Sequence, residues 1–221
     1  MSSITENYRV VCEKIALAAE GREVKLIPVS KFQPTEAVAE LQRIGIKEFG
    51  ENYPQHITER AQIFPEIAWH MIGQMQSNKV KYLLGHIALL QSLDRMSLAA
   101  TVERLAGARE MVQDVLVQVN IGHEPQKGGV EPGELEGFLE ELVRMPHIRV
   151  RGLMTIPPAQ EPPEPYFAAT RALFDRLAGK DDRVSMEILS MGMSHDYEKA
   201  VAMGANMVRV GTAIFGPRPQ H

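Results

Sequence analysis

Short apolar runs alternate with segments of helical periodicity along almost the whole chain. Several of the runs are apolar on both faces, which is typical of strands in a parallel sheet covered by helices. The predicted strands span 24–30, 46–52, 68–74, 88–93, 114–120, 150–156, 184–191 and 207–211. Amphipathic segments between them predict helices over 35–44, 95–108, 134–145 and 166–178, and an extra helix over 5–20 precedes the first strand.

This alternation predicts an α/β protein, a single (β/α)8 TIM-type barrel with an extra N-terminal helix, forming one domain over residues 1–221. An open, doubly wound sheet is the alternative, because the pattern alone does not show closure. Segments 122–133 and 157–165 are rich in Pro, Gly and Glu, and each follows a predicted strand. We expect both to be loops on the functional face of the barrel rather than domain boundaries.

Composition narrows the function classes. Of 221 residues, 44% are hydrophobic and 24% are charged, an ordinary balance for a soluble globular protein. A net charge of −4 gives no basic surface for nucleic acid, and no apolar run approaches the roughly 18 residues of a membrane span. The N-terminus has no signal-peptide pattern, and Cys12, the single cysteine, has no partner for an intramolecular disulfide. We expect a cytoplasmic protein that binds neither nucleic acid nor membranes.

Polar residues at strand ends are the candidates for chemistry, since functional groups of such barrels gather at the carboxyl ends of the strands. These residues are Ser30, Lys31, Glu51, Asn52, Gln74, Asn120, Thr155, Ser190, Arg209, Gly211 and Thr212. Lys31 directly follows an almost wholly apolar strand. A partly desolvated ammonium has a lowered pKa, and Schiff-base chemistry needs the neutral amine. A solvated surface lysine is the alternative, and position alone leaves the two open.

The last predicted strand ends in a candidate phosphate site. Gly211 and Thr212 follow it directly, and backbone N–H groups at such a turn, with a threonine hydroxyl, suit a phosphate. A plain turn is the alternative for Gly211. Arg209 should share a face with Gly211, and a buried charge needs a partner, either a ligand or a structural salt bridge.

Serines and histidines elsewhere allow structural interpretations. Ser190 and Ser194 flank the flexible Gly192, and Ser194 is predicted to cap a helix over 196–203. His70 is interpreted as a hydrogen-bonded core histidine. The other histidines show no ligand spacing, so we expect no metal site.

Six motifs in register then indicate a family. They are VSKFQP (29–34), FGENYPQ (49–55), WHMIGQMQSNKVK (69–81), GLMTI (152–156), LSMGMSHD (189–196) and VRVGTAIFG (208–216). Together they closely resemble the pyridoxal-phosphate homeostasis protein family, whose members are single-domain relatives of the alanine racemase barrel. The resemblance runs from about residue 25 to residue 216, nearly the whole chain.

The resemblance implies a cofactor site for pyridoxal 5'-phosphate (PLP), with neither a catalytic residue nor a metal. According to the resemblance, Lys31 forms the aldimine and Asn52 lies beside the cofactor ring. By the same resemblance, Arg209 contacts the pyridine nitrogen. The phosphate-binding set is Ser190, Gly211 and Thr212. An arginine at the ring nitrogen keeps that nitrogen unprotonated and weakens the ring as an electron sink, so the site favours holding the cofactor.

The chain also departs from the family pattern. His195 follows SMGMS where a small or acidic residue is usual, Gln74 replaces a common histidine, and Tyr53-Pro54 replaces the usual pair after GEN. These changes alter the rim of the site. They affect a partner contact or a cofactor-transfer step more than cofactor binding.

The expected function is cofactor homeostasis: the protein holds PLP as a lysine aldimine and buffers or delivers it, without strong catalysis of its own. The implied partners are PLP and, for delivery, PLP-dependent apoenzymes, and we expect a monomer. An amino-acid racemase using the same aldimine is the alternative. It needs an acid/base group on each face of the substrate, and related racemases take the second group from another domain, whereas this sequence ends five residues after Gly216. A third interpretation is a barrel enzyme with Lys31 as an aldolase-type lysine.

Overall fold

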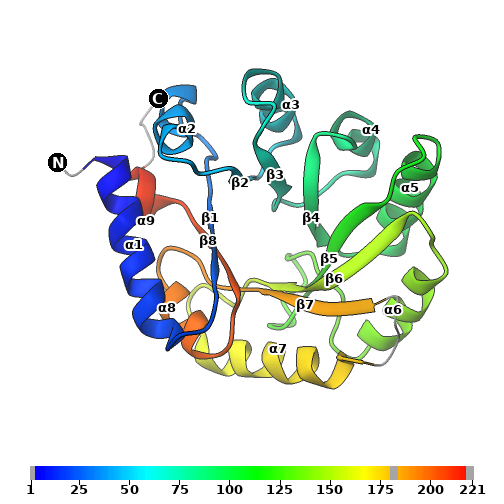
Figure 1. The fold of residues 1–221 in the computed structure, drawn as a ribbon. Helices are drawn as coiled ribbons and strands as arrows, with labels where there is room; N and C mark the ends of the chain where they lie inside the picture. Colours follow the sequence, from blue (N-terminus) through cyan, green and yellow to red (C-terminus); the bar gives the residue numbers. More distant parts are fainter. Residues whose placement is uncertain (1–2, 180–183, 218–221) are drawn as a thin grey trace.

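Eight parallel strands form one curved sheet in the computed structural model, which describes residues 3–179 and 184–217. The order of neighbours is β1-β8-β7-β6-β5-β4-β3-β2. The strands are β1 (Lys25–Pro28), β2 (Glu48–Glu51), β3 (Ala68–Met71), β4 (Ile87–Leu93), β5 (Gln113–Val119), β6 (Ile148–Thr155), β7 (Val184–Ser190) and β8 (Met207–Val210). Helices surround the sheet on its outer side (Figure 1).

The sheet closes on itself almost completely. β1 pairs with β8 in parallel over the whole length of both strands, whereas the bridge to β2 lies just beyond the end of β1. There Val29 forms an isolated bridge with Gly50, and the Ser30 amide donates to the Gly50 carbonyl at 3.0 Å. The architecture is therefore a TIM-type (β/α)8 barrel, which confirms the predicted fold and makes the open-sheet alternative wrong.

The helices follow the strands in the order expected for such a barrel. They are α1 (Ile4–Ala19), α2 (Thr35–Arg43), α3 (Pro54–Ile63), α4 (Val80–Leu83), α5 (Met96–Gly107), α6 (Leu135–Val143), α7 (Glu164–Leu177), α8 (Tyr197–Ala202) and α9 (Thr212–Phe215), with the 3-10 turn η1 (Ser77–Lys79) before α4. The extra helix α1 packs against α8 and α9 (Figure 1). It begins at Ser3, whose hydroxyl accepts the Glu6 amide at 3.1 Å.

Two of these helices have no clear signal in the sequence. α3 buries Ile57 and Arg60, so a charged side chain stands where an apolar stripe would reveal an amphipathic helix. α4 is a single turn of four residues. The predicted helices and all the predicted strands are confirmed, with ends that differ from the prediction by at most three residues.

The barrel interior holds its own small core. Ile27, Leu89, Leu116, Met154 and Met207 fill it, and the larger core lies between the sheet and the helices. Gly152 on β6 allows the close approach of β7, since its φ is +147° and a Cβ there would lie 1.9 Å from the Ile188 carbonyl oxygen.

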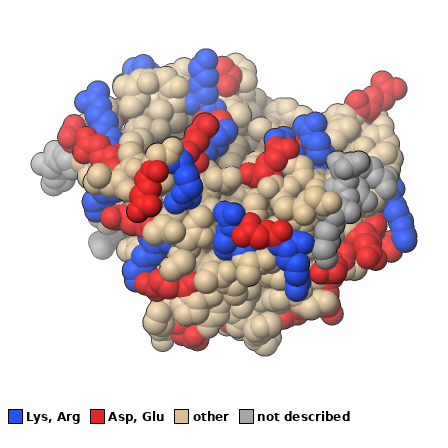
Figure 2. Space-filling model, turned by 60° about the horizontal axis from the view of Figure 1, so that its bottom comes forward, with Lys and Arg blue, Asp and Glu red and all other residues tan. Residues whose placement is uncertain are grey.

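The surface charge is mixed. Acidic and basic side chains are interspersed on the face shown in Figure 2, without a broad area of one sign. No helix among the described residues has the length and apolar character needed to cross a membrane.

Candidate functional site at the mouth of the barrel

Lys31 lies in a tight turn directly after β1. The Gln33 amide donates to the Ser30 carbonyl at 3.0 Å, which places Lys31 and Phe32 at the two central positions of the turn. Phe32 has a φ of +62°, the left-handed conformation that usually requires glycine at this position of the turn. The half-buried Lys31 has its ammonium nitrogen 5.7 Å from the centre of the Phe32 ring. This turn therefore presents the lysine at the mouth of the barrel.

A buried guanidinium holds both ends of this turn. Arg60, on α3, donates from Nη1 to the Ser30 carbonyl at 3.1 Å and to the Ser30 hydroxyl at 2.7 Å. Its Nη2 donates to the Gln33 carbonyl at 2.5 Å. The same Nη1 lies 2.7 Å from Oε2 of Glu51, which is fully buried.

The carboxylate of Glu51 also fixes the next turn. Its Oε1 accepts the backbone amides of Asn52 at 2.6 Å and Tyr53 at 3.2 Å. The ion pair between Arg60 and Glu51 thus connects the turn of Lys31 with the turn of Asn52. The sequence places Glu51 at a strand end but contains no signal for Arg60, because no local pattern pairs two charges from different elements.

A cavity of about 250 Å³ lies among the carboxyl ends of the strands. Of the predicted site residues, Lys31, Asn52, Arg209, Gly211 and Thr212 line it together. Ser190 does not line the cavity: it is fully buried below Arg209. Residues of the segment after β7, Met193, Ser194 and His195, complete this side of the lining.

Arg209 is a buried cation at the floor of this cavity. It is 3% exposed, and it donates to the Ser190 hydroxyl at 2.6 Å and to the Thr155 carbonyl at 2.9 Å. No carboxylate of the described residues pairs with it, so the structural salt bridge considered from the sequence is not formed there. Burial lowers the pKa of Arg209 to about 10, against the opposing effect of Asp196. A desolvated cation without an anionic partner is costly, and an electron-rich ligand atom would offset that cost.

Behind Arg209, hydrogen bonds continue through the barrel interior. The Ser190 hydroxyl donates to Gln91 Oε1 at 2.7 Å, and Gln91 Nε2 lies 2.9 Å from His70 Nδ1. His70 Nε2 in turn lies 3.3 Å from a carboxylate oxygen of Glu48. His70 is 3% exposed, so the prediction of a hydrogen-bonded core histidine is confirmed.

Ser194 serves the turn after β8 rather than a helix. Its hydroxyl oxygen accepts the backbone amides of Gly211 at 3.1 Å and Ala213 at 3.3 Å. The cap residue of α8 is Asp196, whose carboxylate accepts the Met193 amide at 2.6 Å. The prediction that Ser194 caps this helix is therefore wrong, because its side chain points across to the neighbouring strand end.

The residues of this cavity fit PLP. An aldehyde needs a primary amine, which Lys31 supplies, and a phosphate needs the hydroxyl and amide donors around Ser194, Gly211 and Thr212. Asn52 Oδ1 is buried and accepts no hydrogen bond from the described residues, so a ligand donor would complete it. Among the described residues, no group of His, Cys, Asp and Glu side chains could hold a metal ion.

Sequence comparison gives the relatives of the chain. Residues 1–219 match the family model of the alanine racemase N-terminal domain. The pyridoxal phosphate homeostasis protein of Aquifex aeolicus (strain VF5) is 42% identical over 224 residues, which cover 99% of this chain and 96% of that protein. The protein of the same name from Escherichia coli (strain K12) is 37% identical, covering 99% of this chain and 98% of its own length.

Solved structures agree with this result. PipY of Synechococcus elongatus PCC7942 without PLP superposes with a TM-score of 0.89 at 32% identity, covering 97% of this chain and 100% of that chain. The same protein with PLP bound has a TM-score of 0.82 at 32% identity, covering 93% and 100%. An alanine racemase of Clostridium difficile 630, at 17% identity and a TM-score of 0.76, covers 97% of this chain and 57% of its own, and shows the shared fold alone. The chain belongs to the pyridoxal phosphate homeostasis protein family, within the alanine racemase N-terminal domain group.

Proposed function

We propose that this protein binds PLP in the cavity at the mouth of the barrel and serves intracellular cofactor homeostasis. The observation that supports this most directly is Arg209, a cation 3% exposed with no described anionic partner, on the floor of a cavity that Lys31 also lines. The cofactor supplies an aldehyde that a lysine amine can hold as a Schiff base. PLP is also bound in the solved PipY structure, a relative at 32% identity.

Each lining residue has a distinct role in this proposal. Lys31 holds the cofactor covalently, and Asn52 contacts the ring through its unpartnered amide oxygen. Gly211 and Thr212 form the phosphate side of the cavity: Thr212 and the Ser194 hydroxyl donate to the phosphate, and the Gly211 amide holds Ser194 in place by donating to its oxygen at 3.1 Å. Ser190 acts through Arg209, since its hydroxyl accepts a bond from that guanidinium at 2.6 Å.

The proposed role is to hold and release the cofactor, without strong catalysis. Arg209 cannot give up its proton readily, so it donates to the ring nitrogen and leaves that nitrogen unprotonated, which makes the ring a poor electron sink. Exposed residues at the lining, Met193, His195 and Thr212, leave the cavity open to solvent. An open site suits loading and delivery to PLP-dependent apoenzymes, and it does not shield a carbanion from water.

Spectroscopy followed by peptide mapping tests the proposal. Purified protein incubated with PLP should develop the absorbance band of a lysine Schiff base, and borohydride reduction followed by proteolysis should find the modification on Lys31. A spectrum equal to that of free PLP plus protein would reject cofactor binding. Modification of another lysine would reject the assignment of Lys31.

Two further assays separate the possible roles of the bound cofactor. Mixing the loaded protein with a PLP-dependent apoenzyme, in the presence of a trap for free PLP, should still activate the apoenzyme if delivery is direct. Rapid formation of D-alanine from L-alanine would instead show an amino-acid racemase and overturn the non-catalytic role.

A further inference from the structure

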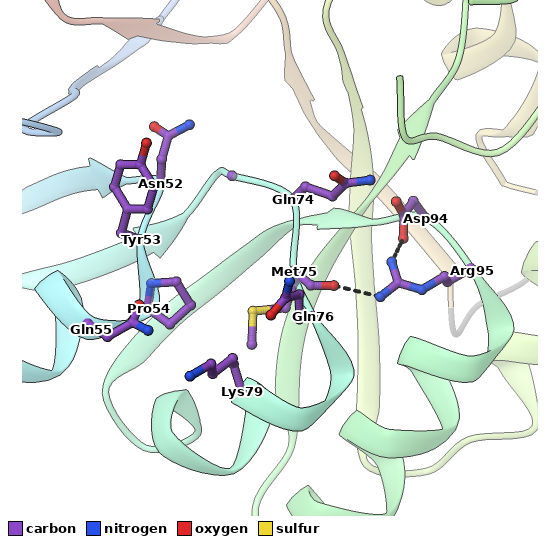
Figure 3. A pocket seen from close by; sticks show the side chains of 11 residues that line it. Asn52, Tyr53, Pro54, Gln55, Gln74, Met75, Gln76, Lys79, Asp94 and Arg95 are labelled. Carbon is purple, nitrogen blue, oxygen red and sulfur yellow. Dashed lines mark hydrogen bonds and ion pairs between the residues drawn. The ribbon is translucent and has the colours of Figure 1, made fainter. Parts of the chain in front are cut away.

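A second, larger cavity lies beside the cofactor cavity. Its volume is about 700 Å³, and it lies between the segments that follow β2, β3 and β4 (Figure 3). Asn52 lines both cavities, so they meet at this residue. Small-molecule sites commonly have volumes of roughly 300–1,000 Å³, and this cavity falls within that range.

Two cationic side chains line this second cavity, Arg95 and Lys79, and they differ in their partners. Arg95 is held in place, because Nη1 donates to Asp94 at 2.5 Å and Nη2 donates to the Met75 carbonyl at 2.6 Å. Lys79 is half-buried, and none of the described residues forms an ion pair or hydrogen bond with its ammonium group. Figure 3 shows its side chain extending below Pro54 and Gln55. The cavity therefore presents one uncompensated positive charge.

The surroundings of Lys79 favour an anion further. The side-chain amides of Gln74 and Gln76 line the cavity, and neither has a hydrogen-bond partner among the residues described. Both residues are exposed. Asp94 is the one carboxylate of the lining, and burial raises its pKa against the opposing effect of Arg95. The N–H groups of the two glutamine side-chain amides are therefore available to an anion in this cavity, beside the Lys79 ammonium.

An apolar surface lies next to Lys79 in the lining, at Tyr53 and Pro54 (Figure 3). The Tyr53 ring is 40% exposed and is braced by Phe32 and His56, each with its ring centre 5.3 Å away. Pro54 continues this surface in the lining. A flat apolar group can pack on the face of such a ring.

We infer that the second cavity binds a small organic carboxylate, whose anionic group is held by Lys79 and the neighbouring amides and whose apolar body packs on Tyr53 and Pro54. The geometry also links this ligand to the cofactor cavity. Gly73 lies so close to Asn52 that a Cβ on it would be 2.4 Å from the Asn52 carbonyl oxygen. A ligand that moves this segment moves Asn52, and by linkage the two ligands then change each other's affinity by the same factor.

Benzoate is a suitable probe, and the first titration uses protein without PLP so that the result does not depend on the proposed function. We expect saturable binding by calorimetry, with amide shifts at Gly73, Gln74 and Gln76 in ¹H–¹⁵N spectra. Lys79→Met should weaken binding about tenfold, the effect of losing one charge-assisted hydrogen bond, and Lys79→Arg should restore most of it. Lys31→Ala should leave benzoate binding unchanged, since Lys31 lines the cofactor cavity and is not in the lining of the second one.

The matched control is Lys81→Met. Lys81 lies two residues further along the same segment, exposed, with its ammonium 4.8 Å from the centre of the Tyr82 ring, and it does not line the cavity. Equal affinity of the wild type and Lys79→Met would overturn the inference, as would an absence of saturable binding. Shifts confined to His195, Gly211 and Thr212 would place benzoate in the cofactor cavity and also overturn it. Equal, Lys79-dependent binding of inorganic phosphate would show a site for any anion and reject the carboxylate assignment.

Discussion

The Arg60 guanidinium lies 2.7 Å from the Glu51 carboxylate, and both groups are shielded from solvent, at 7% and 0% exposure. This pair connects three pieces of backbone around the cofactor cavity: the two ends of the Lys31 turn and the start of the Asn52 turn. A buried pair of this kind contributes to stability chiefly because removing one member leaves the other charge unpaired.

Arg60→Met should therefore destabilise the protein by about 3–5 kcal/mol, since it removes the guanidinium from the buried Glu51 carboxylate, whose other ionisable neighbour, His56, lies 3.7 Å away. Arg60→Met combined with Glu51→Gln should cost less than the sum of the two single changes, because the double variant has no unpaired charge. Urea denaturation of the wild type and the three variants measures this. Additive effects would mean that the two groups do not act as a pair.

The same pair should also position Lys31. Arg60→Lys keeps the charge but cannot bond both ends of the turn, so PLP affinity should fall about tenfold while the stability loss stays smaller than for Arg60→Met. Absorbance titration with PLP measures the affinity. Unchanged PLP affinity in folded Arg60→Lys would show that the lysine turn holds its shape without this clamp.

Lys31→Ala should abolish the Schiff-base absorbance band and leave the free energy of unfolding within about 0.5 kcal/mol of the wild type, because the side chain lies at the rim of the barrel. Lys31→Arg is the matched variant, since it keeps a positive charge near the Phe32 ring but has no primary amine. Loss of the band in both variants, with normal folding by circular dichroism, is the expected result. A band retained in either variant would assign the linkage to another lysine, of which Lys79 and Lys127 are the first to test.

Arg209 should be more important for the cofactor than for the fold. Arg209→Met removes a desolvated cation, so the unfolding free energy of PLP-free protein should change by only about 1 kcal/mol, whereas PLP affinity should fall about tenfold or more. Arg209→Glu places a carboxylate against the ring nitrogen, favours its protonation and should shift the absorbance of the bound cofactor. An unchanged spectrum and affinity in both variants would argue against contact between Arg209 and the ring.

Glu48 should give the protein an acid-sensitive component of stability. The hydrogen bond from His70 and the ion pair with Lys25, 2.7 Å away, lower the pKa of Glu48 from 4.5 to about 2 in the folded protein. Because the folded pKa is depressed, the contribution is fully present above about pH 4.5 and is lost as the pH falls toward about 2. The difference in unfolding free energy between the wild type and Glu48→Gln should shrink over this window. Glu134→Gln, at an exposed residue, controls for the removal of a charge, and a difference that stays constant with pH would contradict the assignment.

The sequence predicts the barrel well because its signals are local. Each strand is a short apolar run, and most helices have apolar residues at helical spacing. The alternation of strands and helices is therefore visible in the sequence without tertiary information. The placement of Lys31, Arg209 and Gly211 at strand ends follows from the same reading, since the carboxyl ends of parallel strands meet at one face. The structure brings these three residues to one cavity.

The supporting residues could not be predicted in the same way, because their partners are distant in sequence. Arg60 reaches Ser30 over 30 positions, and Ser190 reaches Gln91 over 99. The local sequence predicts that Ser194 caps the nearest helix, whereas its hydroxyl accepts amides 17 and 19 residues further on. Such contacts depend on the barrel being closed, which no local pattern encodes.

The barrel closes between β1 and β2 through one isolated bridge, Val29 with Gly50, and the bond from the Ser30 amide. This junction lies directly below the turns of Lys31 and Asn52, and the Arg60–Glu51 pair spans it. Local opening has the lowest cost where few backbone hydrogen bonds must break. In native-state hydrogen exchange, the Ser30 amide should therefore exchange through smaller openings than the amides of β5 and β6, whose pairing extends over seven positions. Lys31 then lies beside one of the two weakly paired junctions of the barrel, the other being β7 with β8, which are in register at Ser190 and Met207. Loading and release of a cofactor at Lys31 would therefore require no opening of the rest of the barrel.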